Sequence, residues 1–339
     1  NKLTVDIDYA QNVGQEITPS DPEIEGPSFI NSILEDNTVK NDSEIDFSKT
    51  SEEDGTKGLY YTNTNTEDGK TVYYYRGAVE NNYVKFAGYY WRIIRINEDS
   101  SIRLIYQGET PNATGSASTI GSSDFNTNRD DNAYVGYMYG EVGASTYEAT
   151  HANINDSTIK RVIDQWYEEN LLDNYSIYLA DSGFCGDRSL ASGSGYGTSD
   201  TYYGVYNMFV DTYQPQFACS QSNDLYTTSN SNKGNKALDY PIGLIAVSEV
   251  AYAGGGSGSA NSSYYLYTGV NYWTISPLLF QTMNMTTGYY GVFDNGSLQN
   301  NRYAASSFNV RPVINLKSDV KIVEGGDGTV SNPYVIKTS

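Results

Sequence analysis

The chain has 339 residues, 38% of them hydrophobic, and a formal net charge of -20 at pH 7. Its negative field repels phosphate backbones, which argues against nucleic acid as a partner, and no apolar run is long enough to span a bilayer. The chain begins at Asn1 and not at Met, which leaves room for a leader or a membrane anchor before it.

The first 57 residues are acidic and poor in aromatic side chains. Carboxylates that repel one another, interrupted by Pro19, Pro22 and Pro27, indicate a stalk or a loosely attached lead-in. Within it, only residues 29–34 have the composition of a short helix. We therefore expect an acidic stalk at 1–57, followed by one folded domain at 58–339.

Aromatic, β-branched and alternating residues then predict a series of strands. They are expected at 71–76, 83–87, 89–96 and 101–106. The short polar connection between the last two is typical of a hairpin. Arg92 and Arg95 are not expected to share one face of their strand, so one of them would be paired in the interior. The strand itself would be covered on both sides.

Residues 156–174 carry the clearest helix pattern, with Asp156 as the expected N-cap. One apolar stripe follows helical spacing and includes Trp166 as a core anchor. Its members are Ile159, Val162, Ile163, Trp166, Tyr167 and Leu171. The opposite, polar face would hold Lys160, Arg161, Asp164, Glu168 and Glu169.

A short strand is expected at 176–180, followed by a long irregular segment at 183–232 that holds Cys185 and Cys219. The two cysteines fit no zinc pattern, and they form either a disulfide or two buried free thiols. A disulfide would hold this long loop in place and would imply an oxidising, extracellular location.

The last third contains shorter signals. Ser248 is expected to cap a helix at 249–253 that ends at Gly254. Closing strands are expected at 320–323 and 334–336. Short twisted antiparallel strands, one long and one short helix, and long loops together predict an α+β fold.

Catalytic and metal-binding patterns are weak. His151 has no acidic or histidine neighbour at metal spacing, and it is interpreted as a structural residue. The glycine-rich stretch 255–259 lacks the lysine of a phosphate loop. Asp187 and Asp327 are either turn formers or calcium ligands, and the turn is favoured. We expect no enzyme activity, no cofactor and no metal, although a hydrolase or oxidase with an unrecognised site stays an alternative.

Residues 271–316 organise the rest of the chain. Strand-like ends enclose a polar and aromatic middle with no clear period, and we interpret the middle as a display surface between two fixed strands. Rigid Tyr beside adaptable Asn, Ser and Gly is the composition of antibody loops. The alternative is that such loops are a common feature of secreted bacterial proteins.

Three motifs in this stretch carry a resemblance: YWxxSP at 272–277, GVFxNGxL at 291–298 and VRPVINL at 310–316. They resemble the C-terminal signature of secreted or anchored gut Firmicutes proteins with a C-type lectin-like fold, in the branch typified by formylglycine-generating enzyme. Further similarity at 89–96, 134–140, 157–171 and 184–189 extends the resemblance over about 70–336. The enzyme of this branch needs cysteines near its C-terminus, and this chain has none after Cys219.

The same branch includes the variable proteins of diversity-generating retroelements, and the layout of 271–307 is similar to their hypermutated region. The resemblance implies a scaffold that includes Trp273, Val310, Arg311 and Pro312. It implies a ligand-binding face of Thr274, Gln281, Met283, Asn284, Met285, Tyr289, Tyr290, Asn295, Gln299, Asn300, Asn301, Tyr303 and Ser306.

The sequence thus predicts an extracellular, cell-surface receptor or adhesin with a hypervariable C-terminal face for a protein or a glycan. The alternative is a structural surface or pilus-associated subunit without diversification.

Overall fold

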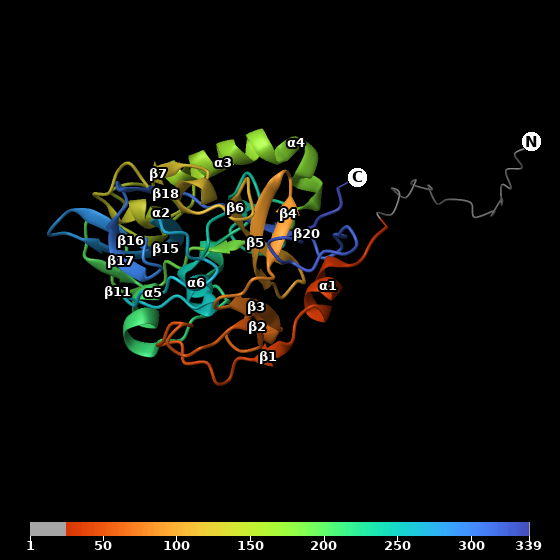
Figure 1. Ribbon diagram of the computed structural model, residues 1–339. Helices are drawn as coiled ribbons and strands as arrows, with labels where there is room; N and C mark the ends of the chain where they lie inside the picture. The colour runs from red at the N-terminus through yellow and green to blue at the C-terminus, as the bar shows by residue number, and fades with distance from the viewer. Residues whose placement is uncertain (1–24, 339) are drawn as a thin grey trace, which may run out of the picture.

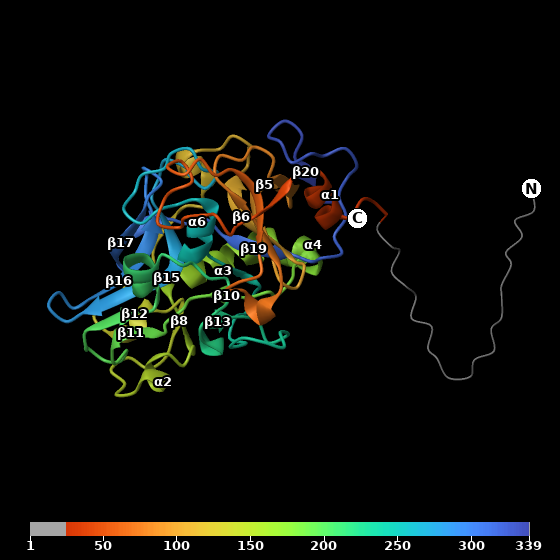
Figure 2. The same ribbon diagram turned by 90° about the horizontal axis from the view of Figure 1, so that it is seen from below.

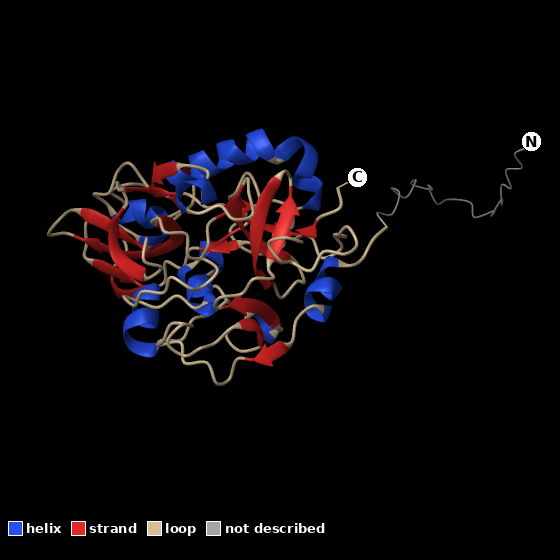
Figure 3. Cartoon of the chain, viewed as in Figure 1, coloured by secondary structure: helices blue, strands red, loops and turns tan. Residues whose placement is uncertain are grey.

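The computed structural model describes residues 25–338, which form a mixed α+β structure (Figure 3). Two large sheets form its centre, and helices and long loops cover them (Figure 1). The α+β class expected from the sequence is confirmed. No helix among the described residues is long and apolar enough to cross a bilayer.

The first sheet has nine strands in the order β1-β2-β3-β5-β6-β19-β14, and β4 pairs with both β5 and β20. Its strands are β1 (Val39–Asn41), β2 (Gly58–Thr62), β3 (Val72–Arg76), β4 (Tyr83–Phe86), β5 (Tyr89–Ile96), β6 (Ile102–Gly108), β14 (Ile242–Gly243), β19 (Val313–Leu316) and β20 (Tyr334–Val335). The β1–β2 and β4–β20 pairs are parallel and the others antiparallel. The predicted β5–β6 hairpin is confirmed, and Arg92 and Arg95 are both buried because both faces of β5 are covered.

The second sheet has seven strands in the order β11-β12-β15-β16-β17, extended by β18 on β15 and by β7 on β18. They are β7 (Ser122–Asp124), β11 (Leu190–Gly193), β12 (Thr201–Tyr203), β15 (Tyr272–Gln281), β16 (Thr286–Val292), β17 (Leu298–Tyr303) and β18 (Ser307–Asn309). Two small pairs join β8 (Met138–Tyr139) to β9 (Asn155–Asp156), and β10 (Phe184–Cys185) to β13 (Leu225–Tyr226). Residues 271–316 therefore link the sheets, since β15–β18 belong to the second and β19 to the first.

Six α-helical segments are present in the described chain: α1 (Phe29–Glu35), α2 (Tyr147–Thr150), α3 (Thr158–Asn170), α4 (Leu172–Tyr175), α5 (Val205–Asn207) and α6 (Val247–Ala253). Short 3₁₀ turns occur at Glu67–Gly69, Gly115–Ser118, Asn132–Val135, Ser176–Tyr178 and Ser222–Asp224, and a π turn at Met208–Thr212. The strand expected at 176–180 was wrong, because only Leu179 bridges to another strand residue, Leu316. Residues 320–323 likewise form no continuous strand, but two isolated bridges, Lys321 with Ser28 and Ile322 with Ile336.

The long predicted helix is α3, and its N-cap is Ser157 in place of Asp156. The Ser157 side chain accepts a hydrogen bond from the backbone N–H of Lys160, which satisfies a free donor of the first turn. Ile159, Ile163 and Tyr167 are buried as expected. Trp166 is half-buried and packs against Tyr89, Trp91 and Tyr106 at the edge of the core, as expected of an anchor.

The short helix α6 ends at Gly254, which has φ 112 as a left-handed C-cap requires. Its start differs from expectation. The N-cap is Ala246, whose backbone N–H donates to the Glu249 carboxylate at 2.9 Å. Ser248 therefore lies inside the helix, and the side chain of Glu249 supplies the capping contact.

The expected stalk at 1–57 is not separate from the domain where the structure describes it. Phe29 and Ile33 of α1 are fully buried in the main core, and β1 pairs with β2. The predicted helix at 29–34 is confirmed as α1. Residues 1–24 of the expected stalk lie outside the described residues. A few apolar side chains in an acidic segment are enough to attach it to the core.

Cys185 and Cys219 form a disulfide, which confirms that alternative over two free thiols. Cys185 ends β10, and Cys219 lies in the segment that follows the π turn. The bond therefore ties the long excursion at 183–232 to itself across 34 residues. Fixing a loop of this length limits the freedom of the unfolded chain and so stabilises the fold.

Candidate functional site

Three residues of the predicted ligand-binding face lie in the interior. Tyr289 and Tyr290 of β16 and Thr274 of β15 are fully buried. The Tyr289 ring stacks on Phe125 with centroids 3.7 Å apart, and its hydroxyl donates to the Tyr134 carbonyl at 2.6 Å. These residues are corrected to core residues, because all of β16 is covered on both faces and leaves no display side.

The remaining predicted residues fall into two groups at opposite ends of β16. Met283, Asn284 and Met285 form the β15–β16 turn, whereas Asn295 lies in the β16–β17 turn. A strand of seven residues separates these turns by roughly 20 Å. Gln299 belongs to the second group, since it pairs with Gly291. One continuous face of all predicted residues is therefore not formed.

The first group has a defined shape, which we call the hairpin tip: residues 281–285 together with Tyr303. Met283 is 94% exposed, Met285 40% and Tyr303 37%. Gln281 is half-buried at the base, and the half-buried Ser306 follows in the turn after β17. Figure 2 shows the β15–β16 hairpin on the side of the molecule opposite to α1 and β20. Asn300 and Asn301 lie on β17, and their side chains are outside the described part of the structure.

Contacts from other loops hold the hairpin tip in place. The backbone N–H of Thr282 donates to Asp200 at 2.5 Å, and its hydroxyl donates to the Thr198 carbonyl at 3.0 Å. The Arg129 guanidinium lies over the Tyr303 ring, 5.3 Å from its centroid. Sequence reasoning missed Arg129 and Asp200, because each lies in an irregular segment that no local pattern marks.

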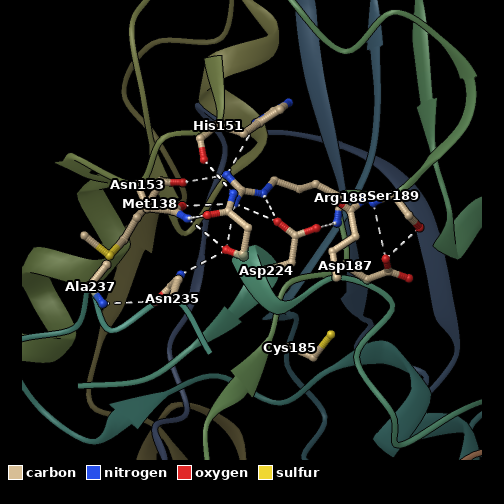
Figure 4. A network of polar contacts seen from close by, with 12 residues as sticks. Met138, His151, Asn153, Cys185, Asp187, Arg188, Ser189, Asp224, Asn235 and Ala237 are labelled. Atoms are coloured by element: carbon tan, nitrogen blue, oxygen red, sulfur yellow. Dashed lines mark hydrogen bonds and ion pairs between the residues drawn. The ribbon is translucent and has the colours of Figure 1, made fainter. Parts of the chain in front are cut away.

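A polar network fills the space between the β10–β13 pair and the segment that follows α2 (Figure 4). At its centre, Arg188 and Asp224 are both fully buried. Arg188 Nε donates to Asp224 at 2.7 Å, and its backbone N–H donates to the same carboxylate at 2.6 Å. Further donors of Arg188 contact the Met138 carbonyl at 3.1 Å and Asn153 Oδ1 at 2.9 Å. This network joins four chain segments into one rigid unit.

His151 belongs to the same network. It is fully buried, and its Nδ1 lies 3.3 Å from Arg188 Nη1. Burial, together with the charge of Arg188, lowers the pKa of His151 well below its ordinary value, so the ring is neutral and Nδ1 accepts the hydrogen bond. This position fits the structural interpretation, since no substrate reaches the ring without opening the core.

The two aspartates considered as calcium ligands serve as turn residues. Asp187 Oδ1 accepts from the backbone N–H and the hydroxyl of Ser189. Asp327 Oδ1 accepts from the backbone N–H of Thr329. Both contacts are the short-range hydrogen bonds by which aspartate stabilises a turn, as the sequence favoured.

A cluster of three aspartates was not foreseen. Carboxylate oxygens of Asp156, Asp164 and Asp239 lie within 4.8 Å of one another, close enough to share a cation. The Lys160 ammonium, which is fully buried, already lies among them at 3.2, 2.6 and 3.0 Å. Lys160 was expected on the exposed face of the helix. It is buried because Asp239, far along the chain, completes its shell.

Acidification is expected to stabilise the wild type relative to Asp164→Asn. Burial, with the nearby Asp156 and Asp239, raises the pKa of Asp164 to about 6 against the opposing effect of Lys160. The folded state then binds a proton that the unfolded state binds only near pH 3.8. This contribution to stability is complete below the pKa of Asp164 in the unfolded state. It is lost as the pH rises through the pKa of Asp164 in the folded state.

The measurement is the midpoint of urea unfolding at several pH values from about 4 to 7. The midpoint of the wild type, relative to that of Asp164→Asn, should rise as the pH falls across this window. Asp173→Asn, at an exposed carboxylate next to α3, should run parallel to the wild type. A constant difference between wild type and Asp164→Asn would contradict the raised pKa.

Comparisons of this chain with protein-family models, with curated proteins and with solved structures find no match. The arrangement therefore has to be interpreted from its own geometry. It consists of an α+β scaffold locked by buried ion pairs, with an exposed hairpin tip held by neighbouring loops.

Proposed function

We propose that the chain is an extracellular, cell-surface ligand-binding protein, a receptor or adhesin without enzyme activity, and that the hairpin tip is its contact surface for a protein partner. The observation that carries this proposal is the exposure of Met283 and Met285 at the end of two buried strands. Methionine is flexible and polarizable, and it is common on surfaces that adapt to a partner. The contacts to Asp200 and Thr198 hold the tip in position.

We further propose a C-type lectin-like scaffold of the formylglycine-generating-enzyme-like branch. The motif residues behave as a scaffold would require. The Trp273 indole N–H donates to the Ser123 carbonyl at 2.8 Å, and Arg311 donates to the carbonyls of Tyr106 and Leu266 at 3.1 Å each. Both side chains are fully buried.

Binding is tested by screening the purified chain against arrays of host extracellular proteins and glycans. Each hit is measured again with Met283→Ser/Met285→Ser. We expect protein hits whose affinity falls about tenfold or more in this variant, because a central apolar contact of an interface is worth about 1–2 kcal/mol or more. Asp319→Asn, an exposed substitution in the first-sheet region, is the matched control. The proposal would be contradicted if no protein bound, or if the affinity of every protein hit were unchanged in the Met283→Ser/Met285→Ser variant.

We also propose that a retroelement diversifies the same surface. The burial of each residue predicts which codons should vary and which should stay constant. The locus would be sequenced from many cells of the source population. We expect variation at the codons of Met283, Asn284 and Tyr303, and constancy at those of Trp273 and Tyr289. An invariant stretch with no template copy nearby would end the diversification proposal and leave the binding proposal standing.

A further inference from the structure

Several arginines are buried in the described part of the chain. Six arginines in the described chain are 8% exposed or less: Arg76, Arg92, Arg95, Arg103, Arg188 and Arg311. Four of them lie within ion-pair distance of a carboxylate: Arg76 of Asp54, Arg95 of Glu98 and Glu249, Arg103 of Glu249, and Arg188 of Asp224. Arg92 and Arg311 have no such partner among the described residues. A buried charge without a counterion is costly, so these two require an explanation.

Arg311 is explained by its hydrogen bonds. Its Nε and Nη1 donate to backbone carbonyls, and its Nη2 donates to Gln107 Oε1 at 3.2 Å. Arg92 is different. Its Nε donates to Asn82 Oδ1 at 2.6 Å and its Nη2 to the Val79 carbonyl at 2.9 Å, but Nη1 has no acceptor among residues 25–338. One end of a buried guanidinium is therefore free to bind an acceptor from outside.

Arg92 lines an open hollow of about 390 Å³ between the β4–β6 strands and the loop before β15. Tyr83 and Tyr265 flank its guanidinium, with ring centroids 3.8 and 5.4 Å from Cζ. The Tyr265 hydroxyl is buried and has no hydrogen-bond partner in the described structure. The lining of the hollow thus includes the Arg92 guanidinium and two buried hydroxyls without a hydrogen-bond partner in the described structure, those of Tyr264 and Tyr265.

The rest of the lining has the chemistry of a sugar site. Tyr264 and Tyr267 add aromatic surface, and Asn112, Thr114 and Ser263 add amide and hydroxyl groups at exposed positions. Aromatic rings with a few convergent polar groups are the usual lining of small-ligand sites. A pyranose ring offers apolar C–H faces to such rings and hydroxyls to such rims. A carboxylate on the sugar would be the missing acceptor for Arg92, and charge-assisted hydrogen bonds of this kind are strong.

We propose that this hollow binds a saccharide unit that carries a carboxylate, such as a uronic or sialic acid, with its carboxylate on Arg92 Nη1 and its ring against the tyrosines. The positive charge of Arg311 also acts on Arg92, and the two charges together favour an anion at this position. Glu80 on the rim and the net charge of -20 disfavour ligands with many negative charges, such as nucleotides. The site belongs to the first sheet, so it is independent of the hairpin tip.

The experiment is isothermal titration of the purified chain with galacturonate, its methyl ester, 3′-sialyllactose, lactose and acetate. An acidic saccharide is expected to bind about 10–100-fold more tightly than its neutral counterpart, and acetate alone more weakly than either acid. Arg92→Gln should remove the preference for the acid, and Arg92→Lys should keep part of it. Arg161→Gln, at an exposed arginine on α3, should bind as the wild type does.

Equal affinity for acid and ester would overturn the proposal, as would the absence of saccharide binding or acetate binding as tight as that of the saccharides. A retained acid preference in a folded Arg92→Gln variant would also overturn it. If Arg92→Gln does not fold, Tyr267→Leu/Asn112→Ala leaves Arg92 in place. It should weaken acid and ester alike, and unchanged affinity in that variant would exclude this hollow as the site.

Discussion

Asp224→Ala is expected to lower the free energy of unfolding by about 3–5 kcal/mol, because it leaves the buried Arg188 without its counterion. Asp224 accepts both the side-chain and the backbone N–H of Arg188, and both residues are fully buried. The lost contacts would also release Asn153 and Met138, which the same guanidinium holds. Urea unfolding followed by circular dichroism gives the value.

Two further variants separate the charge from the packing. Arg188→Met/Asp224→Leu removes both charges together, and it should be less destabilised than Asp224→Ala, because no unpaired charge remains in the interior. Asp294→Ala, at an exposed carboxylate, should change stability by less than about 0.5 kcal/mol. A change of less than about 1 kcal/mol in Asp224→Ala would contradict the structural importance of the pair.

Tyr289→Ala is expected to cost a similar 3–5 kcal/mol, through the cavity that a large buried ring leaves behind. The Tyr289 ring stacks on Phe125 and lies edge-on to Trp273, 5.9 Å away between centroids. Thermal and urea unfolding of the variant measure the loss. The result bears directly on the central stretch, because a display tyrosine at this position would leave stability nearly unchanged.

The matched comparisons use the same residue type. Tyr289→Phe keeps the ring and leaves the Tyr134 carbonyl without its donor, so about 1 kcal/mol is expected. Tyr303→Ala, at the hairpin tip, should cost less than about 1 kcal/mol, since more than a third of that side chain is exposed. If Tyr289→Ala and Tyr303→Ala lowered the free energy of unfolding by similar amounts, the assignment of Tyr289 to the core and Tyr303 to the surface would be contradicted.

The strands around β5 could be predicted from the sequence almost to the residue. Residues 89–96 are aromatic and β-branched residues with two arginines, and a polar turn follows, so local composition alone places β5 and β6. The same local pattern failed at Lys160. Its place on α3 is polar by periodicity, but its ammonium is buried between Asp156, Asp164 and the distant Asp239. No spacing rule connects residues 79 positions apart.

The central stretch was misread for a related reason. Residues 286–292 mix Thr, Gly and Tyr, a composition that suits a display loop as well as a strand buried on both faces. Phe125 and Phe209, from segments far away in the sequence, cover Tyr289 and Tyr290. Composition shows which side chains a segment has, but the residues that pack over them determine whether those side chains are exposed to solvent.

The position of β19 has a consequence for how the chain is made. This strand lies between β6 and β14, and β20 completes the edge at β4. During synthesis the first sheet therefore stays open until β19 and β20 have left the ribosome, with two strand edges unpaired. Native closure thus depends on pairing between strands far apart in the sequence, such as Leu104 with Ile314, and pairing of this kind is slow.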